Sequence, residues 1–139
     1  MTGTMEGFFA VSGATGHIHV HVQPQYDEER SQPAQDHYIW QYHIRIENHG
    51  PEHVRLVDRH WIITDGQGLS QEVRGEGVVG EQPVIAPGAS FDYVSGCPLM
   101  TPSGMMQGSY GMETADGRQF RVAIPVFDLL SPDSRRAAH

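Results

Sequence analysis

Three histidines at alternate positions, His17, His19 and His21, carry the residue type in this sequence best suited to binding a metal ion. On a β-strand they would share one face, about 6.6 Å apart, so an adjacent pair could hold one ion through bonds of about 2.1 Å. The outer pair, about 13 Å apart, could not easily do so. No carboxylate or cysteine stands beside them in the sequence to complete a coordination shell. A metal site is therefore left undecided, and we favour a solvated strand face.

A second candidate is the glycine-rich segment 75–80, GEGVVG, which has the spacing of a dinucleotide-binding loop. Such a loop needs a helix directly after its last glycine, and Pro83 and Pro87 follow too closely for one, so a Rossmann site is excluded. A weaker nest of backbone amides could still bind an anion. Its groups would be Arg74, Gly75, Gly77 and Gly80. We favour the alternative, a tight connection between strands that requires positive φ.

The remaining candidates are a lone cysteine and a group of methionines. Cys97 excludes an internal disulfide, and because no nucleophile-elbow pattern surrounds it we interpret it as a small buried hydrophobic residue. The stretch 96–108 is rich in proline, glycine and methionine and is predicted to be a long, irregular connection. Exposed methionines adapt well to a partner's apolar side chains. A predicted interaction surface there consists of Leu99, Met100, Met105 and Met106.

Composition and charge exclude several classes of function. The net charge is −8, and all nine basic residues are arginines that do not cluster, except for Arg135 and Arg136 at the end. We therefore expect no binding of nucleic acid, whose phosphates need neutralising cations. The absence of lysine excludes Schiff-base chemistry and covalent attachment of pyridoxal phosphate. No cofactor is expected.

Length and targeting signals predict one soluble domain. A chain of 139 residues can bury a sufficient core, and we expect an ordered region from about 16 to 130 with flexible ends at 1–15 and 131–139. The apolar stretch 8–11 is too short for a signal peptide, and no segment reaches the ~20 apolar residues of a membrane span. A single cysteine cannot form an internal disulfide, which agrees with a protein of a reducing compartment. A cytoplasmic location is expected.

The elements that must position these residues are predicted to be short strands. From Tyr38 to Glu47, apolar residues occupy the even positions, and from Gln41 onward polar residues occupy the odd ones, which is typical of a strand with one buried face. A parity change within residues 53–64 predicts a bulge near Val57 and Asp58. Asp116-Gly117 predicts a hairpin. It leads into a strand whose inward residues would be Phe120, Val122, Ile124 and Val126.

No window of the sequence has helical periodicity, and 16 glycines with 9 prolines argue against long helices. About seven or eight short strands separated by turn signals are typical of an antiparallel β-sandwich. We therefore predict an all-β fold.

An ordered series of motifs covers most of the chain from about Tyr38 to Leu129. They are RHWIITD at 59–65, EVRGEGVVG at 72–80, PG at 87–88, YVSG at 93–96, TPSGMM at 101–106 and IPVF at 124–127. The series closely resembles the ApaG family. The resemblance implies an immunoglobulin or fibronectin type III-like β-sandwich in a bacterial protein, a role in protein binding, and an association with cobalt and magnesium resistance. The histidine-rich stretch 17–21 departs from the family pattern, so a metal role there is not inherited from it.

These observations predict a non-enzymatic, soluble binding or interaction module. Its partner would be another protein, with no insertion into a membrane, and its oligomeric state is left undetermined. By resemblance the module would act in the homeostasis of divalent cations, cobalt and magnesium. The alternative is a protein that binds phosphate or pyrophosphate at the glycine-rich loop 75–80.

Overall fold

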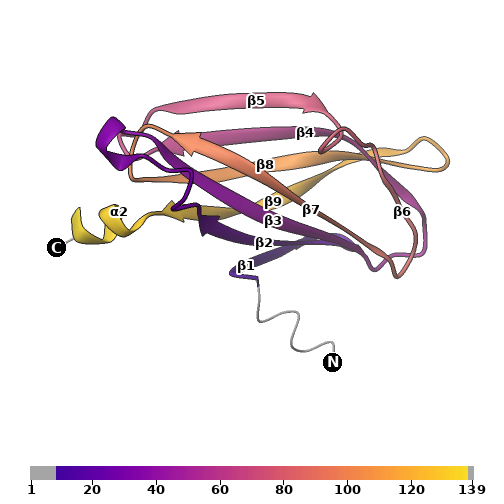
Figure 1. Ribbon diagram of the computed structural model, residues 1–139. Coiled ribbons are helices and arrows are strands. Elements are labelled where there is room, and N and C mark those ends of the chain that lie inside the picture. The colour runs from indigo at the N-terminus through magenta and orange to yellow at the C-terminus, as the bar shows by residue number, and fades with distance from the viewer. Residues whose placement is uncertain (1–8, 138–139) are drawn as a thin grey trace.

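The computed structural model describes residues 9–137, in which nine strands form two antiparallel sheets packed face to face (Figure 1). The first sheet has the order β1-β2-β3-β7 and the second the order β5-β4-β8-β9, with β6 beside β4. The strands are β1 (Val11–Thr15), β2 (Ile18–Tyr26), β3 (Tyr38–Asn48), β4 (Val54–Asp65), β5 (Ser70–Glu76), β6 (Val84–Ile85), β7 (Ser90–Leu99), β8 (Ser103–Thr114) and β9 (Gln119–Leu130). The predicted all-β sandwich is confirmed.

Strand β3 shows how alternation in the sequence builds the core. Every even position of this strand is buried, and the odd positions between them are partly or fully exposed, as predicted. The buried apolar side chains are Tyr38, Trp40, Tyr42, Ile44 and Ile46. Each large apolar side chain removed from water in this way contributes about 1.5–3 kcal/mol to stability. The other face of β3 is left free to carry polar chemistry.

An aromatic cluster joins the two sheets at the centre of the sandwich. Tyr42 of β3 meets Trp61 of β4 edge-on, with ring centroids 5.4 Å apart, and Trp61 meets Phe127 of β9 at 6.0 Å. Edge-on pairs of this kind are favourable beyond the area they bury. The cluster therefore fixes the distance between the sheets.

Two local predictions are confirmed. The pairing of β4 with β8 shifts register between Leu56 and Asp58, which is the predicted bulge. The turn after β8 closes as a hairpin, with Gly117 at φ +87° and its amide donating to the carbonyl of Thr114.

Strand β9 departs from the prediction at its middle. Ile124 is buried as expected, but Val126 is exposed and Phe127 takes the buried position instead. The register of β8 with β9 shifts at this point, opposite Pro125. Proline has no amide hydrogen for the ladder and is found in strands chiefly at bulges and edges. The bulge moves each later side chain to the other face.

Ordered structure extends beyond the predicted boundaries. Residues 11–15, expected to be flexible, form β1 and pair with β2, and helix α2 (Pro132–Ala137) follows β9. A short 3-10 helix (Pro33–Gln35) interrupts the loop between β2 and β3. Residues 1–8 and 138–139 lie outside the described part of the chain. Within residues 9–137, none of the helices has the length and apolar character that crossing a bilayer requires.

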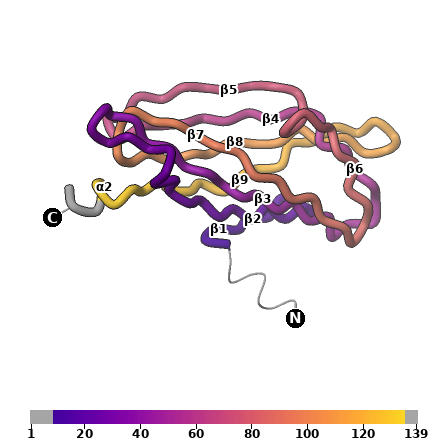
Figure 2. The backbone as a smooth tube through the Cα atoms, viewed as in Figure 1, coloured from indigo at the N-terminus to yellow at the C-terminus, as the bar shows by residue number. Residues whose placement is uncertain are grey.

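The two long sides of the sandwich differ. On one side β1 of the first sheet lies beside β9 of the second, and the amide of Ala123 donates to Thr15 Oγ1 at 3.0 Å across them. On the other side the edge strands are β5 and β7. Figure 2 follows the backbone along β5 and β7 and shows the glycine-rich turn after β5. This second side is open, and it holds the candidate site.

Candidate functional site

A cleft of about 400 Å³ opens between the edge strands β5 and β7. Most of the residues that line it are apolar or aromatic, although polar atoms make up nearly half of its exposed surface, and Arg59 is the one charged side chain among the described residues that line it. The lining residues include Tyr42, Arg59, Trp61, Val73, Val78, Val79, Gly80, Tyr93, Ser95 and Cys97. An apolar hollow with a few convergent polar groups is the usual form of a binding site.

A second hollow, of about 590 Å³, continues the cleft along the same side of the sandwich. The two hollows share Ile63, Gln71 and Pro98 as lining residues. The second one is also lined by Leu69 and Met100, whose side chains are largely exposed. We call the two hollows together the edge groove.

The glycine-rich segment forms a tight turn at one end of the edge groove. The amide of Val78 donates to the carbonyl of Glu81 at 2.8 Å, and the amide of Glu81 donates back to Val78 at 2.9 Å. The two residues between them, Val79 and Gly80, have φ values of +43° and +80°, as in a type I′ hairpin turn. The predicted tight connection with positive φ is therefore confirmed. A β-branched residue is strained at positive φ, so Val79 is an outlier.

Arg59 holds this turn against β4. Its guanidinium Nη1 donates to the carbonyls of Glu76 and Gly77, both at 3.0 Å. The guanidinium lies directly on Gly75, where a Cβ would be 2.7 Å from Nη2. At Gly77, φ is +61° and a Cβ would lie 2.0 Å from the carbonyl oxygen of Glu81. The glycine spacing thus serves the close packing of the turn.

Arg74, which we predicted to be the cation of the glycine-rich loop, lies away from the edge groove. Arg74 is 70% exposed, pairs with Glu72 at 3.7 Å, and does not line the edge groove. It alternates along β5 with Val73, which does line the groove, so the two side chains point to opposite faces. Among the predicted amide donors, that of Gly77 already bonds to the carbonyl of Val57 at 2.8 Å. Arg59 stands in the motif RHWIITD, but only the fold shows that its guanidinium lies against the glycine-rich segment.

The floor of the cleft is uncharged near neutral pH. Burial raises the pKa of Tyr93 and Tyr110, whose hydroxyls hydrogen-bond to each other between β7 and β8. Desolvation also raises the pKa of Tyr42, although a hydrogen bond with Ser95 opposes it. Burial raises the pKa of the Cys97 thiol to about 11, which keeps it protonated and unreactive. The interpretation of Cys97 as a buried hydrophobic residue agrees with its 2% exposure.

The predicted irregular connection at 96–108 is wrong. Strand β7 runs to Leu99 and β8 begins at Ser103, because these residues continue the pairing with β3 and β4. Leu99 and Met106 are core residues, Met105 is partly buried, and Met100 is 78% exposed. Three of the four predicted surface residues, Leu99, Met100 and Met106, nevertheless line the edge groove.

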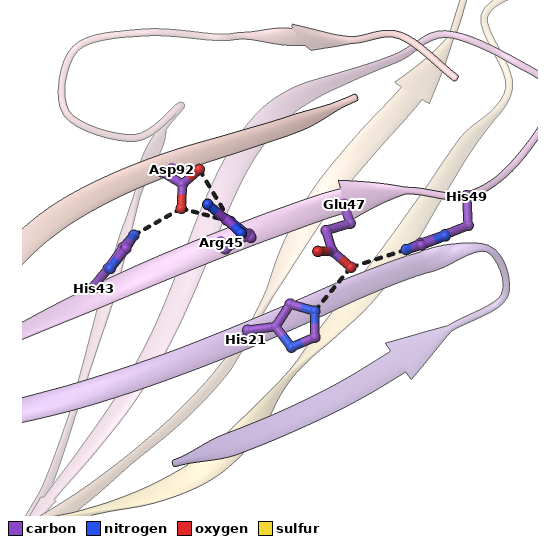
Figure 3. A network of polar contacts seen from close by, with 6 residues as sticks. All are labelled: His21, His43, Arg45, Glu47, His49 and Asp92. Carbon is purple, nitrogen blue, oxygen red and sulfur yellow. Dashed lines mark hydrogen bonds and ion pairs between the residues drawn. The ribbon is translucent and has the colours of Figure 1, made fainter. Parts of the chain in front are cut away.

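The histidines lie on a different face, the outer face of the first sheet. His17 falls in the turn before β2 and packs on Gly50, whereas His19 and His21 project from β2. Glu47 of β3 accepts hydrogen bonds from His21 Nε2 at 3.0 Å and from His49 Nε2 at 2.9 Å (Figure 3). The expectation that no carboxylate accompanies these histidines is therefore wrong. The sequence could not show it, because Glu47 is 26 residues from His21 and arrives through strand pairing.

Electrostatics favour an ionised Glu47. Burial alone would raise the pKa of this carboxyl, but the hydrogen bonds from His49 and His21 outweigh burial and lower the pKa below its usual range. Beside this group, Asp92 binds His43 at 2.8 Å and Arg45 Nε at 2.9 Å (Figure 3). The outer face thus carries two adjacent carboxylate-centred networks.

The fold and the edge groove define a two-sheet β-sandwich with one open, apolar-lined side. Comparison with known proteins shows which sandwich it is. The model of the ApaG domain matches residues 28–114. The chain is 55% identical to Protein ApaG of Parvibaculum lavamentivorans over 128 residues, which covers 92% of this chain and 98% of that protein. It is 57% identical to Protein ApaG of Rhodospirillum centenum over 124 residues, 89% of this chain and 95% of the relative. The chain belongs to the ApaG family.

Solved structures agree with this assignment. A Bordetella pertussis protein described as ApaA superposes with a TM-score of 0.81 at 47% identity, covering 88% of this chain and 98% of that one. The C-terminal domain of wzt superposes with a TM-score of 0.52 at 12% identity, which shows a shared fold alone. No enzyme activity is indicated by the names of these relatives.

Proposed function

We propose that this chain is a non-enzymatic binding module that holds an extended segment of a partner protein in the edge groove. The observation that carries the proposal is where the family motifs meet. Residues from the segments 59–65, 72–80, 93–96 and 101–106, which carry the resemblance, all line the same cleft although they are far apart in the sequence. Core packing alone does not require them to share one open hollow.

The shape and chemistry of the groove suit an extended peptide. Strands β5 and β7 are sheet edges, and such edges pair with an added strand through backbone hydrogen bonds, while pockets receive alternate side chains. Val73, Leu69 and Met100 are exposed apolar side chains along the groove. Arg59, the charged residue that lines the cleft, would complement an acidic side chain of the partner.

Hydrogen bonds hold the end wall and the floor of the groove in place, which would lower the cost of binding. The Arg59 bonds to the carbonyls of Glu76 and Gly77 hold its end wall, and the Tyr93–Tyr110 hydroxyl pair holds its floor. A preformed site avoids much of the ordering cost that a flexible loop would add. The strained Val79 at the rim supports the same conclusion, because strained backbone clusters at functional sites.

Three further parts of the proposal come from the family and the sequence. A cytoplasmic location and a link to cobalt and magnesium homeostasis remain predictions. Phosphate or pyrophosphate binding at the loop 75–80 is the alternative function. Amide NMR signals of Gly75, Gly77 and Gly80 that shift with millimolar pyrophosphate would favour the alternative.

The test is a selection of random peptides displayed on phage against the full chain. We expect selected peptides to shift the backbone amide NMR signals of β5, β7 and the turn 78–81. Val73→Arg should abolish binding by placing a charge in the groove. Val126→Arg, at an exposed valine of β9 on the other side of the sandwich, should leave binding intact. Peptides that bind the Val73→Arg variant as well as the native chain would refute the proposal.

A further inference from the structure

A cluster of three histidines and one glutamate occupies the outer face of the first sheet, away from the edge groove. We propose that His19, His21, Glu47 and His49 form a binding site for a divalent transition metal ion of the zinc class. The central observation is that ligand atoms of His19, His21 and Glu47 all lie within 4.8 Å of one another. The following contacts show why this arrangement suits an ion.

Strand register brings the four side chains together. His19 of β2 lies directly opposite Glu47 of β3, and His21 is the next outward residue along β2. Directly opposed side chains have Cβ atoms about 4.5–5.5 Å apart, and diagonal neighbours about 7–8 Å. His49 follows β3 and stays in the ladder, because its amide donates to the carbonyl of His17 at 2.9 Å. Glu47 is therefore surrounded by imidazoles on a fixed backbone.

The separations are close to those of a coordinated ion. Glu47 Oε1 lies 3.0 Å from His21 Nε2 and 2.9 Å from His49 Nε2, and the rings of His19 and His49 are 4.3 Å apart. Ligand atoms bound tetrahedrally at about 2.1 Å stand about 3.4 Å apart. His19, His21 and Glu47 would thus supply three ligands, and His49, which lies outside that group but bonds to Glu47, would supply the fourth by a side-chain rotation.

Neighbouring residues orient His21 for this role. Ser12 of β1 lies opposite His21, with its Oγ 2.6 Å from Nδ1. With Nε2 bound to metal, Nδ1–H would donate to this hydroxyl, which is the outer-shell contact that fixes the tautomer of a ligating histidine. The ring of Phe9 packs on His21 at 5.5 Å. The His21 side chain is 13% exposed and that of His49 54%, so the site is held on one side and open to solvent on the other.

The donor set selects the type of ion. Imidazole nitrogens with one carboxylate suit zinc, cobalt, nickel and copper, whereas magnesium requires oxygen ligands. The adjacent group on the same face is different, because Arg45 Nε contacts both carboxylate oxygens of Asp92, at 2.9 and 3.2 Å. That arginine pairs with both carboxylate oxygens of Asp92 and neutralises their charge. His43, which also binds Asp92, therefore serves as a matched control.

The experiment is a calorimetric titration of the untagged, metal-free chain with zinc chloride, repeated with cobalt chloride while the visible absorption of the ion is recorded. We expect one ion per chain, cobalt bands typical of four-coordinate nitrogen and oxygen ligands, and a rise in Tm of about 10 °C when free zinc is about 100-fold above Kd. His21→Ala and Glu47→Gln should weaken binding by more than about 100-fold, and Ser12→Ala by about 10-fold or more. His43→Ala should bind as the native chain does.

Melting of each metal-free variant separates loss of ligands from loss of folding. If His21→Ala is less stable without metal, then the cobalt spectrum of His19→Ala provides the second assay, since His19 makes no hydrogen bond to Glu47 that its loss would break. Absence of binding at millimolar zinc would overturn the proposal. So would binding that persists in His21→Ala and Glu47→Gln, or that is lost equally in His43→Ala.

Discussion

The turn at the end of the edge groove makes a quantitative test of the structure possible, because two glycines in it share a left-handed backbone but differ in how closely they are packed. Gly77 and Gly80 both have positive φ, at +61° and +80°. A Cβ at Gly77 would lie 2.0 Å from the carbonyl oxygen of Glu81, whereas a Cβ at Gly80 would meet nothing within 4 Å. Substitution of each by alanine therefore separates the cost of the left-handed backbone from the cost of close packing.

The expected magnitudes follow from these contacts. Alanine in the left-handed region costs about 1–2 kcal/mol, and this applies to both positions. At Gly77 the carbonyl of Glu81 must also move by about 1 Å, which disrupts the two hydrogen bonds between Val78 and Glu81, at about 1 kcal/mol each. We expect a loss of about 3–4 kcal/mol for Gly77→Ala and about 1–2 kcal/mol for Gly80→Ala.

Urea unfolding followed by tryptophan fluorescence measures both values. For a domain of this size the thermal counterpart is a fall in Tm of about 4 °C per kcal/mol. Equal losses in the two variants would show that the Gly77 backbone does not approach Glu81 as described. A loss below about 1 kcal/mol in both would refute the left-handed turn itself.

Two other predictions follow from polar groups in and near the groove. Arg59→Met should lower the free energy of unfolding by about 2–4 kcal/mol, since it removes charge-assisted bonds to two carbonyls. Arg121→Met removes only solvent-exposed contacts, an ion pair to Asp58 and bonds to Ser109, and should cost less than about 1 kcal/mol in the same urea assay. The free energy of unfolding should also fall as pH rises above about 10. Burial raises the folded-state pKa of Tyr93 and Tyr110 above the ordinary value of 10.0, so the unfolded chain loses these protons at a lower pH than the folded chain does. Tyr93→Phe should reduce that slope by up to about 1.4 kcal/mol per pH unit, and an unchanged slope between pH 10 and 11.5 would contradict the burial of this hydroxyl.

Many features of the fold could be predicted from the sequence because they depend on neighbouring residues. The alternation in β3 placed Tyr42 and Ile44 inside, and the parity change in β4 indicated its bulge. The glycine spacing at 75–80 indicated positive φ for the same local reason. The alternation of buried and exposed residues is interrupted by a bulge at Pro125 in β9, and the prediction that Val126 is buried failed there. The sequence pattern alone does not show which residue a bulge leaves unpaired.

The candidate sites depended on contacts that no local pattern contains. His19 and His21 were visible in the sequence, but their partner Glu47 is supplied by the register of β2 against β3. The methionines at 105 and 106 were interpreted as a loop because glycine and proline surround them, yet pairing of β8 with β4 made them part of a strand.

The sequence by itself determined that this chain folds as a two-sheet sandwich of the ApaG family, since alternation sets the face of each side chain and the ordered motifs identify the relatives. Only the tertiary structure decided that Arg59 lies on Gly75, that the family motifs meet between β5 and β7, and that Glu47 lies beside His19 and His21. The physical reason is that a strand's periodicity is local, whereas its register and its neighbours result from packing of the whole core. A shift of one residue in the pairing of a strand would have moved each of its side chains to the opposite face of the sheet. The aromatic side chains of β3 are buried in only one of these two registers.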